Sequence, residues 1–221
     1  PGASWYYADD NYAVRVPQGA TAYMDISERN MDELTDYALE FWFRTDADGT
    51  LVTTDAADYM SVGLEEGKPY VATPNGRINL PVDQMYNDNQ WHQLAILSHR
   101  LDNAQIVLDD AVLSLNTYNV LAGLRGAKMI FGDTISQLDI DEVRLWKASI
   151  TAKWIQDNRR ARVAGNQPGL ITYYPMDERY MDHNIEFYRS SLADYAVDSL
   201  YNHTSPLQST TYDLQPTPPN L

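Results

Sequence analysis

Three carboxylates within four residues, Asp139, Asp141 and Glu142, are the first side chains in the sequence with the potential for catalysis. Paired carboxylates hydrolyse glycosidic bonds, and a retaining glycosidase needs two of them about 5–5.5 Å apart. Alternate residues of a regular strand share a face, so Asp139 and Asp141 point one way and Glu142 the other. The next residue on the face of Asp141 is Val143, or Arg144 if the strand contains a bulge, and neither is acidic. We therefore assign no catalytic residue, expect Asp141 and Glu142 to accept structural hydrogen bonds, and keep a glycosidase as the least favoured alternative.

Charged residues and tryptophans alternate along two segments and share one face of each: Glu40, Trp42 and Arg44 on the first, and Glu142, Arg144 and Trp146 on the second. If the two segments are neighbouring strands, Glu40 meets Arg144 and Arg44 meets Glu142, each pair contributing roughly 0.2–1 kcal/mol. The favoured interpretation is a structural ladder packed under a helix. The alternative is a ligand groove in which an exposed Trp42 stacks on a sugar. Its binding residues are Trp42, Glu40, Arg44, Arg144 and Trp146, and burial of both tryptophans contradicts it.

Calcium is the metal that the sequence allows, because Ca²⁺ takes six to eight oxygen ligands and several loops are rich in Asp and Asn. These loops are Asp9–Asn11, Asp46–Gly49, Asp83–Asn89 and Asp177–Asp182. Asp46–Gly49 begins like a calcium loop, but no bidentate Glu follows at the required spacing, so a hairpin turn is predicted there. A Ca²⁺ cofactor is left open, with no metal ligand assigned.

The four histidines lack the paired spacing of a zinc site: they are His92, His99, His183 and His203. His92 lies in a predicted strand with Leu94 and Ile96, so we expect a structural histidine.

The composition excludes several classes of protein. Among 221 residues there are 16 Lys and Arg against 31 Asp and Glu, a net charge of −15. Nucleic acid is not an expected partner, because phosphate binding needs a basic face and the one basic cluster is Arg159, Arg160 and Arg162. No cysteine is present, which removes disulfides and thiolate metal sites. No apolar run approaches the roughly 20 residues of a membrane helix.

The elements that must position these side chains are predicted to be strands. In the segment Tyr37–Arg44, the residues Tyr37, Leu39, Phe41 and Phe43 share a face that we assign to the core. Other strands are predicted, with turn residues between them, at Tyr12–Val16, Ala22–Ile26, Gly49–Thr54, Tyr59–Leu64, Pro69–Ala72, Arg77–Leu80, Trp91–Ser98, Ala104–Leu108, Ala111–Leu115, Lys128–Phe131, Ile140–Trp146 and Leu170–Met176. One surface helix is expected over Ala152–Val163, capped by Thr151. The fold class is therefore all-β, a two-sheet antiparallel jelly-roll sandwich with one short surface helix.

A set of short motifs occurs in a fixed order: "LEFWFR" (Leu39–Arg44), "TLVT" (Thr50–Thr53), "WHQLA" (Trp91–Ala95), "AQIVLDD" (Ala104–Asp110), "DIDEVRLW" (Asp139–Trp146) and "PGLITYYPMDE" (Pro168–Glu178). This series resembles the laminin G-like and pentraxin-like domains of the concanavalin A-like lectin/glucanase superfamily. The resemblance covers about residues 11–178. One departure is the turn at Asp109 and Asp110, where the family has a turn ending in Gly, so a distorted hairpin is expected.

The resemblance implies a concanavalin A-like sandwich with one concave face, in a family whose members are mostly non-catalytic and bind carbohydrate or protein, often with calcium at the rim. We expect a domain at residues 1–178 and a C-terminal extension or linker at 179–221, either packed on the sandwich or free of it. The expected function is binding or adhesion to a glycan or an extracellular protein. The expected context is a larger secreted or cell-surface protein of the bacterial envelope, with other domains in the same polypeptide. A structural spacer without a ligand is the alternative.

Overall fold

The structure is a computed structural model that describes residues 12–19, 22–25, 36–57, 59–98, 104–115, 128–147, 150–161, 163, 167–174, 191–192, 207–209 and 213–216. Strands dominate these residues. They are β1 (Tyr12–Pro17), β2 (Ala22–Asp25), β3 (Tyr37–Arg44), β4 (Gly49–Thr54), β5 (Ser61–Glu65), β6 (Lys68–Thr73), β7 (Gly76–Asn79), β8 (His92–Ser98), β9 (Gln105–Leu108), β10 (Ala111–Ser114), β11 (Lys128–Phe131), β12 (Gln137–Trp146), β13 (Leu170–Tyr174), β14 (Ser191–Leu192), β15 (Leu207–Ser209) and β16 (Asp213–Pro216). The helix α1 spans Ala152–Asn158.

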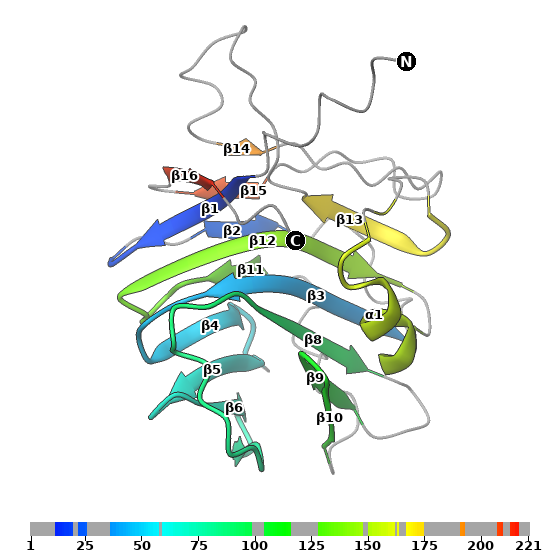
Figure 1. The fold of residues 1–221 in the computed structure, drawn as a ribbon, viewed down its shortest axis with the longest axis horizontal. Coiled ribbons are helices and arrows are strands. Elements are labelled where there is room, and N and C mark those ends of the chain that lie inside the picture. The colour runs from blue at the N-terminus through cyan, green and yellow to red at the C-terminus, as the bar shows by residue number, and fades with distance from the viewer. Residues whose placement is uncertain are drawn as a thin grey trace, which may run out of the picture.

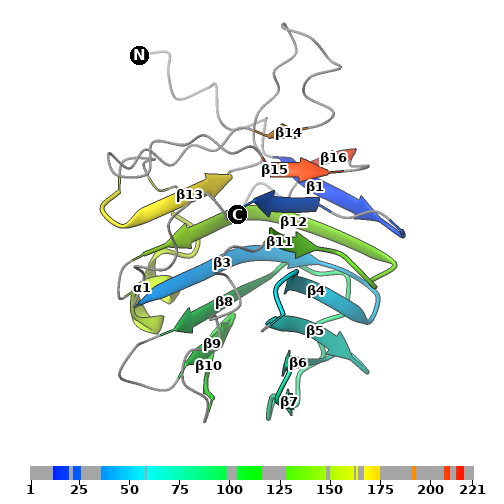
Figure 2. The same ribbon diagram turned by 180° about the vertical axis from the view of Figure 1, so that it is seen from behind.

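The strands form two antiparallel sheets that lie face to face (Figure 1). Sheet A has the order β10-β9-β8-β3-β12-β1-β16, with β13 also paired to β12. Sheet B has the order β14-β15-β2-β11-β4-β5-β6-β7. Figure 1 looks onto sheet A with α1 in front of it, and Figure 2 looks onto sheet B. The predicted all-β, two-sheet jelly-roll sandwich with one short helix is confirmed.

The main core fills the space between the sheets, as the alternation along β3 predicted. Phe41 and Phe43 are fully buried, and Tyr37 and Leu39 belong to the same cluster. Phe41 of sheet A meets Phe131 of sheet B edge-to-face, with ring centroids 5.3 Å apart. Such aromatic pairs contribute about 0.5–1.5 kcal/mol beyond the burial of their area.

A second apolar cluster lies on the outer face of sheet A, under α1. Its buried members include Ala38, Leu97, Trp146 and Leu170 from the sheet, and Ile155 from the helix. Trp154 of α1 packs edge-to-face on Trp146, with ring centroids 5.1 Å apart. The helix therefore covers one half of this outer face.

The helix begins as predicted and ends earlier than predicted. The Thr151 hydroxyl accepts a hydrogen bond from the Trp154 backbone N–H at 3.1 Å, which caps the N-terminus. Helix α1 stops at Asn158, whereas the expected helix ran to Val163. Two carbonyls beyond it accept side-chain hydrogen bonds instead, that of Arg159 from Trp42 and that of Ala161 from Arg144. The turn after α1 is thus fastened to the sheet.

The extension after residue 178 contributes strands in the parts that the structure describes. The strand β16 pairs with β1, and β15 pairs with β2, so described segments of the extension lie at both sheets. The residues between these strands, and the acidic loop Asp177–Asp182, lie outside the described residues. Among the described residues, no helix combines the length and apolar character required to cross a membrane.

Candidate functional site

A bulge in β12 sets the geometry of the carboxylate-rich segment. Asp141 lies opposite Trp42 and Arg144 lies opposite Glu40, so two residues of β12 face one of β3. Glu142 takes up the extra length with a φ of 52°. The strict alternation assumed from the sequence is therefore wrong here, because the bulge moves Arg144 onto the face of Asp141.

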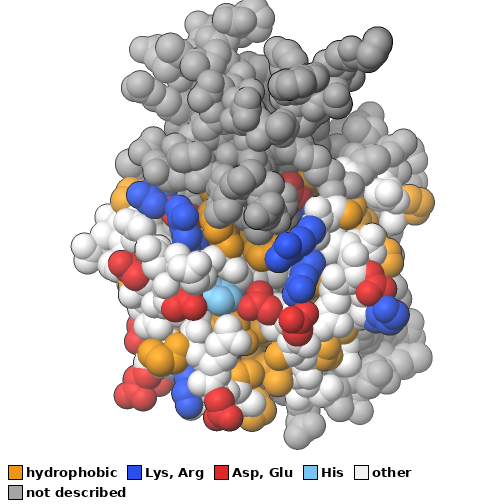
Figure 3. Space-filling view, in the orientation of Figure 1, with side chains coloured by type: hydrophobic (Ala, Val, Ile, Leu, Met, Phe, Trp, Pro, Cys, Tyr) orange, Lys and Arg blue, Asp and Glu red, His pale blue; other side chains and the backbone are white. Residues whose placement is uncertain are grey.

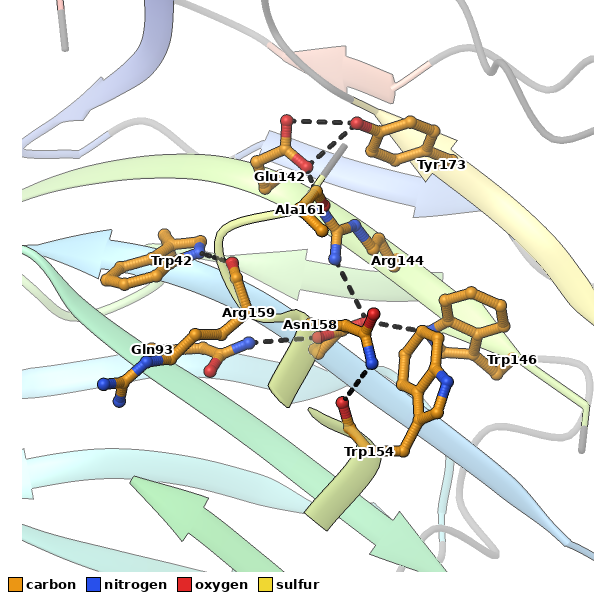
Figure 4. Close-up of polar contacts among 11 residues, drawn as sticks. Trp42, Gln93, Glu142, Arg144, Trp146, Trp154, Asn158, Arg159, Ala161 and Tyr173 are labelled. Atoms are coloured by element: carbon orange, nitrogen blue, oxygen red, sulfur yellow. Dashed lines mark hydrogen bonds and ion pairs between the residues drawn. The ribbon is translucent and has the colours of Figure 1, made fainter. Parts of the chain in front are cut away.

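Arg144 is the centre of a polar network beneath α1 (Figure 4). Its guanidinium contacts the carboxylate of Glu142, lies 3.5 Å from Oε1 of Glu40, and donates to the Ala161 carbonyl at 2.9 Å. The Tyr173 hydroxyl donates to Glu142 at 2.9 Å. Trp146 donates to Oε1 of Glu40 at 2.9 Å, and Nε2 of Gln93 donates to Oε2 at 3.0 Å. The two carboxylates thus share one buried arginine and several neutral donors.

The network shifts the pKa of three of its members, Glu40, Arg144 and Tyr173. Burial raises the pKa of Glu40 by more than Arg144 and Trp146 lower it. Burial opposes the charge on Arg144, but Glu40 and Glu142 outweigh it and raise the pKa of the guanidinium. Burial and the carboxylate of Glu142 raise the pKa of the Tyr173 phenol, which therefore stays a hydrogen-bond donor.

The predicted ligand groove at Trp42 is contradicted by burial. Trp42 is 5% exposed and Trp146 is 2% exposed, while Glu40 and Arg144 are equally buried. The Trp42 indole donates to the carbonyl of Arg159 at 3.1 Å, so the turn after α1 covers it. Of the five predicted ligand-binding residues, Arg44 alone reaches the surface. The structural interpretation fits the other four.

Of the two predicted cross-strand ion pairs, one is present and the other has a different acidic partner. Glu40 pairs with Arg144 as expected. Arg44 pairs with Asp139 rather than Glu142, because the bulge shifts the register and places Asp139 opposite Arg44. Asp139 is fully buried. It accepts from Arg44 and also from Arg15 on β1, at 2.6 and 2.7 Å for the shortest contacts.

The half of the outer face that α1 leaves open is built from the row Arg15, Asp139, Arg44 and Trp91. Arg15 and Arg44 each lie opposite Asp139, and Arg44 lies 5.0 Å above the ring of Trp91. The side chains of Arg15 and Arg44 are 29% and 21% exposed, and Trp91 is partly exposed. This row combines an aromatic surface with guanidinium donors, which is a combination that binds polar ligands.

The opposite border of this open half is formed by the turn after α1 and the β9–β10 hairpin. The Arg159 guanidinium lies 2.9 Å from the exposed carboxylate of Asp110, and Gln156 donates to the Asp110 carbonyl at 3.0 Å. Figure 3 shows basic side chains gathered on two sides of the upper part of this face, with acidic side chains below them. Sequence reasoning missed Trp91 and Arg159, because periodicity does not show which strands become neighbours.

His92 ties together two loops next to Trp91, with its ring on the core side of sheet A against Phe43 and Tyr86. Its Nδ1 lies 2.8 Å from Asp109 and its Nε2 lies 3.0 Å from Asp88. Burial acts to lower the pKa of His92, but the two carboxylates outweigh it and raise that pKa. The expected structural role of His92 is therefore supported. The β9–β10 hairpin pairs in register despite the absent Gly, since Asp109 itself adopts a φ of 50°.

The described acidic loops carry structural contacts. Asp48 accepts from the backbone N–H of Glu66 and Gly67 at 2.7 and 2.8 Å, as the hairpin interpretation of Asp46–Gly49 requires. In the part of the chain that the structure describes, no three acidic or histidine side chains are grouped as metal ligands. The acidic stretches Asp9–Asn11 and Asp177–Asp182 lie outside that part.

Comparisons with known proteins agree with this architecture. Residues 43–146 match the model of the laminin G domain family. A solved structure from Bacteroides ovatus, of a protein for which carbohydrate binding has been proposed, superposes with a TM-score of 0.64 at 11% identity. That match covers 94% of this chain, which spans 60% of the length of the Bacteroides chain.

Other solved structures match with lower scores. Domains LG4–5 of the mouse laminin α1 chain give a TM-score of 0.46 at 16% identity, covering 60% of this chain and 41% of that chain. A heptameric pentraxin from Limulus polyphemus gives 0.47 at 10% identity, covering 67% of this chain and 82% of that chain. Among curated protein sequences, none matches. The family match, together with the two-sheet topology, shows that this chain contains a laminin G-like domain of the concanavalin A-like fold.

Proposed function

We propose that this laminin G-like domain is a non-catalytic module that binds carbohydrate on the open half of the outer face of sheet A. The observation that carries the proposal is the stack of Arg44 on Trp91, a partly exposed residue in the part of the sheet that α1 does not cover. An aromatic face beside oriented donors suits a sugar, which has apolar C–H faces and hydroxyl edges. The carbohydrate binding proposed for the Bacteroides ovatus protein is consistent with this function.

The absence of catalysis is part of the proposal. Asp139 and Asp141 are fully buried, and Asp139 is already held by Arg15 and Arg44. The position across the bulge, where a second carboxylate would complete a pair, is occupied by Arg144. A glycosidase needs two carboxylates that flank the substrate, and this segment of β12 does not offer them.

Binding to a glycan array tests the proposal, with Trp91→Ala as the variant that removes the aromatic surface. We expect the wild-type domain to bind a subset of glycans and Trp91→Ala to lose at least tenfold in affinity. The matched control is Tyr70→Ala, because Tyr70 forms a similar stack with Arg77, at 3.8 Å, on the outer face of sheet B. Loss of binding in Tyr70→Ala with retention in Trp91→Ala would place the ligand on the wrong sheet for this proposal.

A structural spacer without a ligand is the second candidate, and the burial of Trp42 and Trp146 favours it. It predicts no binding to glycans or to extracellular proteins by the wild-type domain. The secreted or cell-surface context, the neighbouring domains and a calcium ion at the rim also remain proposals. Binding measured with millimolar calcium and with a chelator decides whether the ion takes part.

A further inference from the structure

Trp91 ends a short segment that is held in place just before β8 begins. Asp88, Asn89 and Gln90 precede it, and Asn89 has a φ of 61°. The Asn89 backbone N–H donates to the Thr45 carbonyl at 2.9 Å, and that of Gln90 donates to Oδ1 of Asp88 at 2.8 Å. Because the segment is this short, the position of Asp88 affects the position of Trp91.

His92 fastens Asp88 to the sheet. Its Nε2 lies 3.0 Å from Oδ1 of Asp88, and its Nδ1 lies 2.8 Å from Oδ2 of Asp109. Both partners are carboxylates, so both ring nitrogens must carry protons for the two hydrogen bonds to form. A neutral imidazole has one N–H group, and its other nitrogen would turn a lone pair toward a carboxylate oxygen. The arrangement therefore requires the charged form of His92.

The groups that face His92 favour this charged form. Asp88 lies on the loop before β8, and Asp109 lies at the β9–β10 turn. Tyr86 and Phe43 pack against the ring without adding a charge, because burial and Asp109 raise the pKa of the Tyr86 phenol. Burial acts to lower the pKa of His92, but the two carboxylates outweigh it and raise that pKa above its ordinary value of about 6.5.

Of the two contacts, the one to Asp88 is the weaker when His92 becomes neutral. The side chain of Asp88 is 44% exposed, whereas that of Asp109 is 25% exposed. Asp109 is also fastened to β8, since its Oδ1 accepts the Gln93 backbone N–H at 2.9 Å. A neutral imidazole should therefore keep its proton on Nδ1 for Asp109, while Asp88 turns toward solvent. The segment that ends at Trp91 then loses its attachment to His92.

We infer that His92 is a pH-dependent latch for the proposed binding surface. The charged imidazole holds Asp88, and with it Trp91, in the arrangement that binds carbohydrate, and the neutral imidazole releases them. Arg44 stays in place because Asp139 holds its guanidinium, so release separates Trp91 from its stacking partner. Loss of a preorganised arrangement lowers the affinity although every contact residue is still present. The inference rests on the proposed function and adds the way in which that binding is regulated.

The test measures affinity against pH. The glycan array is probed at about pH 6, where His92 is charged, and the probe is the tightest-binding array glycan without a group that titrates between about pH 6 and pH 9. We expect its affinity to fall at least about fivefold as the pH rises through the folded pKa of His92, fivefold being the lower end of usual coupling between sites. NMR titration of the imidazole should give the same midpoint. Because linkage is reciprocal, saturating glycan should raise the pKa of His92 further.

Variants assign that midpoint to His92. His92→Gln cannot donate to both carboxylates, so its affinity should be independent of pH and close to that of the wild type at alkaline pH. Asp88→Asn removes one of the two carboxylates that raise the pKa of His92, so its binding midpoint should move to lower pH. Asp83 is an exposed acid on the same loop that forms no hydrogen bond with His92. The matched control Asp83→Asn should therefore leave the midpoint unchanged.

Three outcomes contradict the inference, and they are distinguishable. If the glycan binds through Trp91 with the same affinity across the titration of His92, the latch is wrong and the proposed function stands. If affinity falls with pH equally in the wild type and in His92→Gln, another group is responsible and the latch is again wrong. If the domain binds no array glycan at any pH, the proposed function fails and this inference fails with it. Circular dichroism at each pH verifies folding, and Asp88→Asn decides alone if His92→Gln is unfolded.

Discussion

The two halves of the outer face of sheet A are built from the same residue types and end with different properties. In the covered half, Arg144 lies between Glu40 and Glu142 beside Trp146, all beneath α1. In the open half, Arg44 lies between Asp139 and Trp91, with part of its side chain in solvent. An arginine, a carboxylate and a tryptophan on neighbouring strands therefore do not define a binding site. The presence of a helix over one half separates its structural role from the binding role that we propose for the other half.

Because α1 covers only one half, ion pairs in the two halves contribute differently to the free energy of unfolding. Charges away from solvent interact strongly, and a buried ion left without its partner is costly. Partly exposed pairs are screened, and each contributes about 0–1 kcal/mol. The covered half should thus respond to mutation mainly in stability, and the open half mainly in binding.

Replacing Arg144 should have the largest effect on stability. Arg144→Ala leaves two buried carboxylates, Glu40 and Glu142, without their cation, and breaking a buried pair in this way costs about 3–5 kcal/mol. We expect urea unfolding to show a loss of that size, or an unfolded domain. Arg44→Gln should cost less than about 1 kcal/mol, because Arg15 still neutralises Asp139. If both variants lost the same free energy of unfolding, the presence of α1 over one half would not explain the difference between the two halves.

His92 should give the next largest effect, at the border of the open half. Both ring nitrogens face carboxylates, so both must carry protons for the two hydrogen bonds to form. Because the pKa of His92 is raised in the folded domain, its stabilisation is fully present below the ordinary pKa of about 6.5. It is lost as pH rises through the raised folded value. We expect His92→Gln to cost ~2 kcal/mol at pH 6 and less at alkaline pH.

Urea unfolding of both proteins across this pH range measures the effect, and NMR titration of the imidazole locates the folded pKa. The neighbouring titrating groups are Asp88, Asp109 and Tyr86. Burial and the charge of Asp109 raise the pKa of the Tyr86 phenol, so Tyr86 stays neutral over the range. If the stabilities of the wild-type domain and of the His92→Gln variant fall in parallel as the pH rises, the histidine is not the cause of the pH dependence.

The covered and open halves also differ in how far the sequence predicts them. The core face of β3 was predictable, since Tyr37, Leu39, Phe41 and Phe43 alternate strictly and burial follows that period. The bulge at Glu142 was not, because its φ of 52° comes from the pairing of β12 with β3 and β13 rather than from a turn residue. A single extra residue changes the face of every side chain that follows it.

The site itself was predicted in part. The sequence brought Glu40 and Arg144 together correctly, but it did not show that the turn after α1 would close over Trp42. It also did not show that Trp91 would stack with Arg44, because that contact depends on which strand becomes the neighbour of β3. Which segment packs over a residue, and which strand pairs with its strand, are decided by tertiary structure. The local periodicity of the sequence carries no information on either.

The smallest of the expected effects tests the cover directly. Thr151 caps α1 through one hydrogen bond to Trp154 N–H, and loss of such a cap costs about 1 kcal/mol. Thr151→Ala should lower the free energy of unfolding by that amount and loosen the contact of Trp154 with Trp146, which near-UV circular dichroism reports. Lys153→Ala is the matched control on the same helix, since its exposed pair with Asp157 contributes about 0.3–0.5 kcal/mol. If α1 is the cover that separates the two halves, Thr151→Ala alters the tryptophan signal of the covered half and leaves glycan affinity at Trp91 unchanged. A loss of glycan affinity in Thr151→Ala without any change at Trp146 would mean that α1 belongs to the binding surface instead.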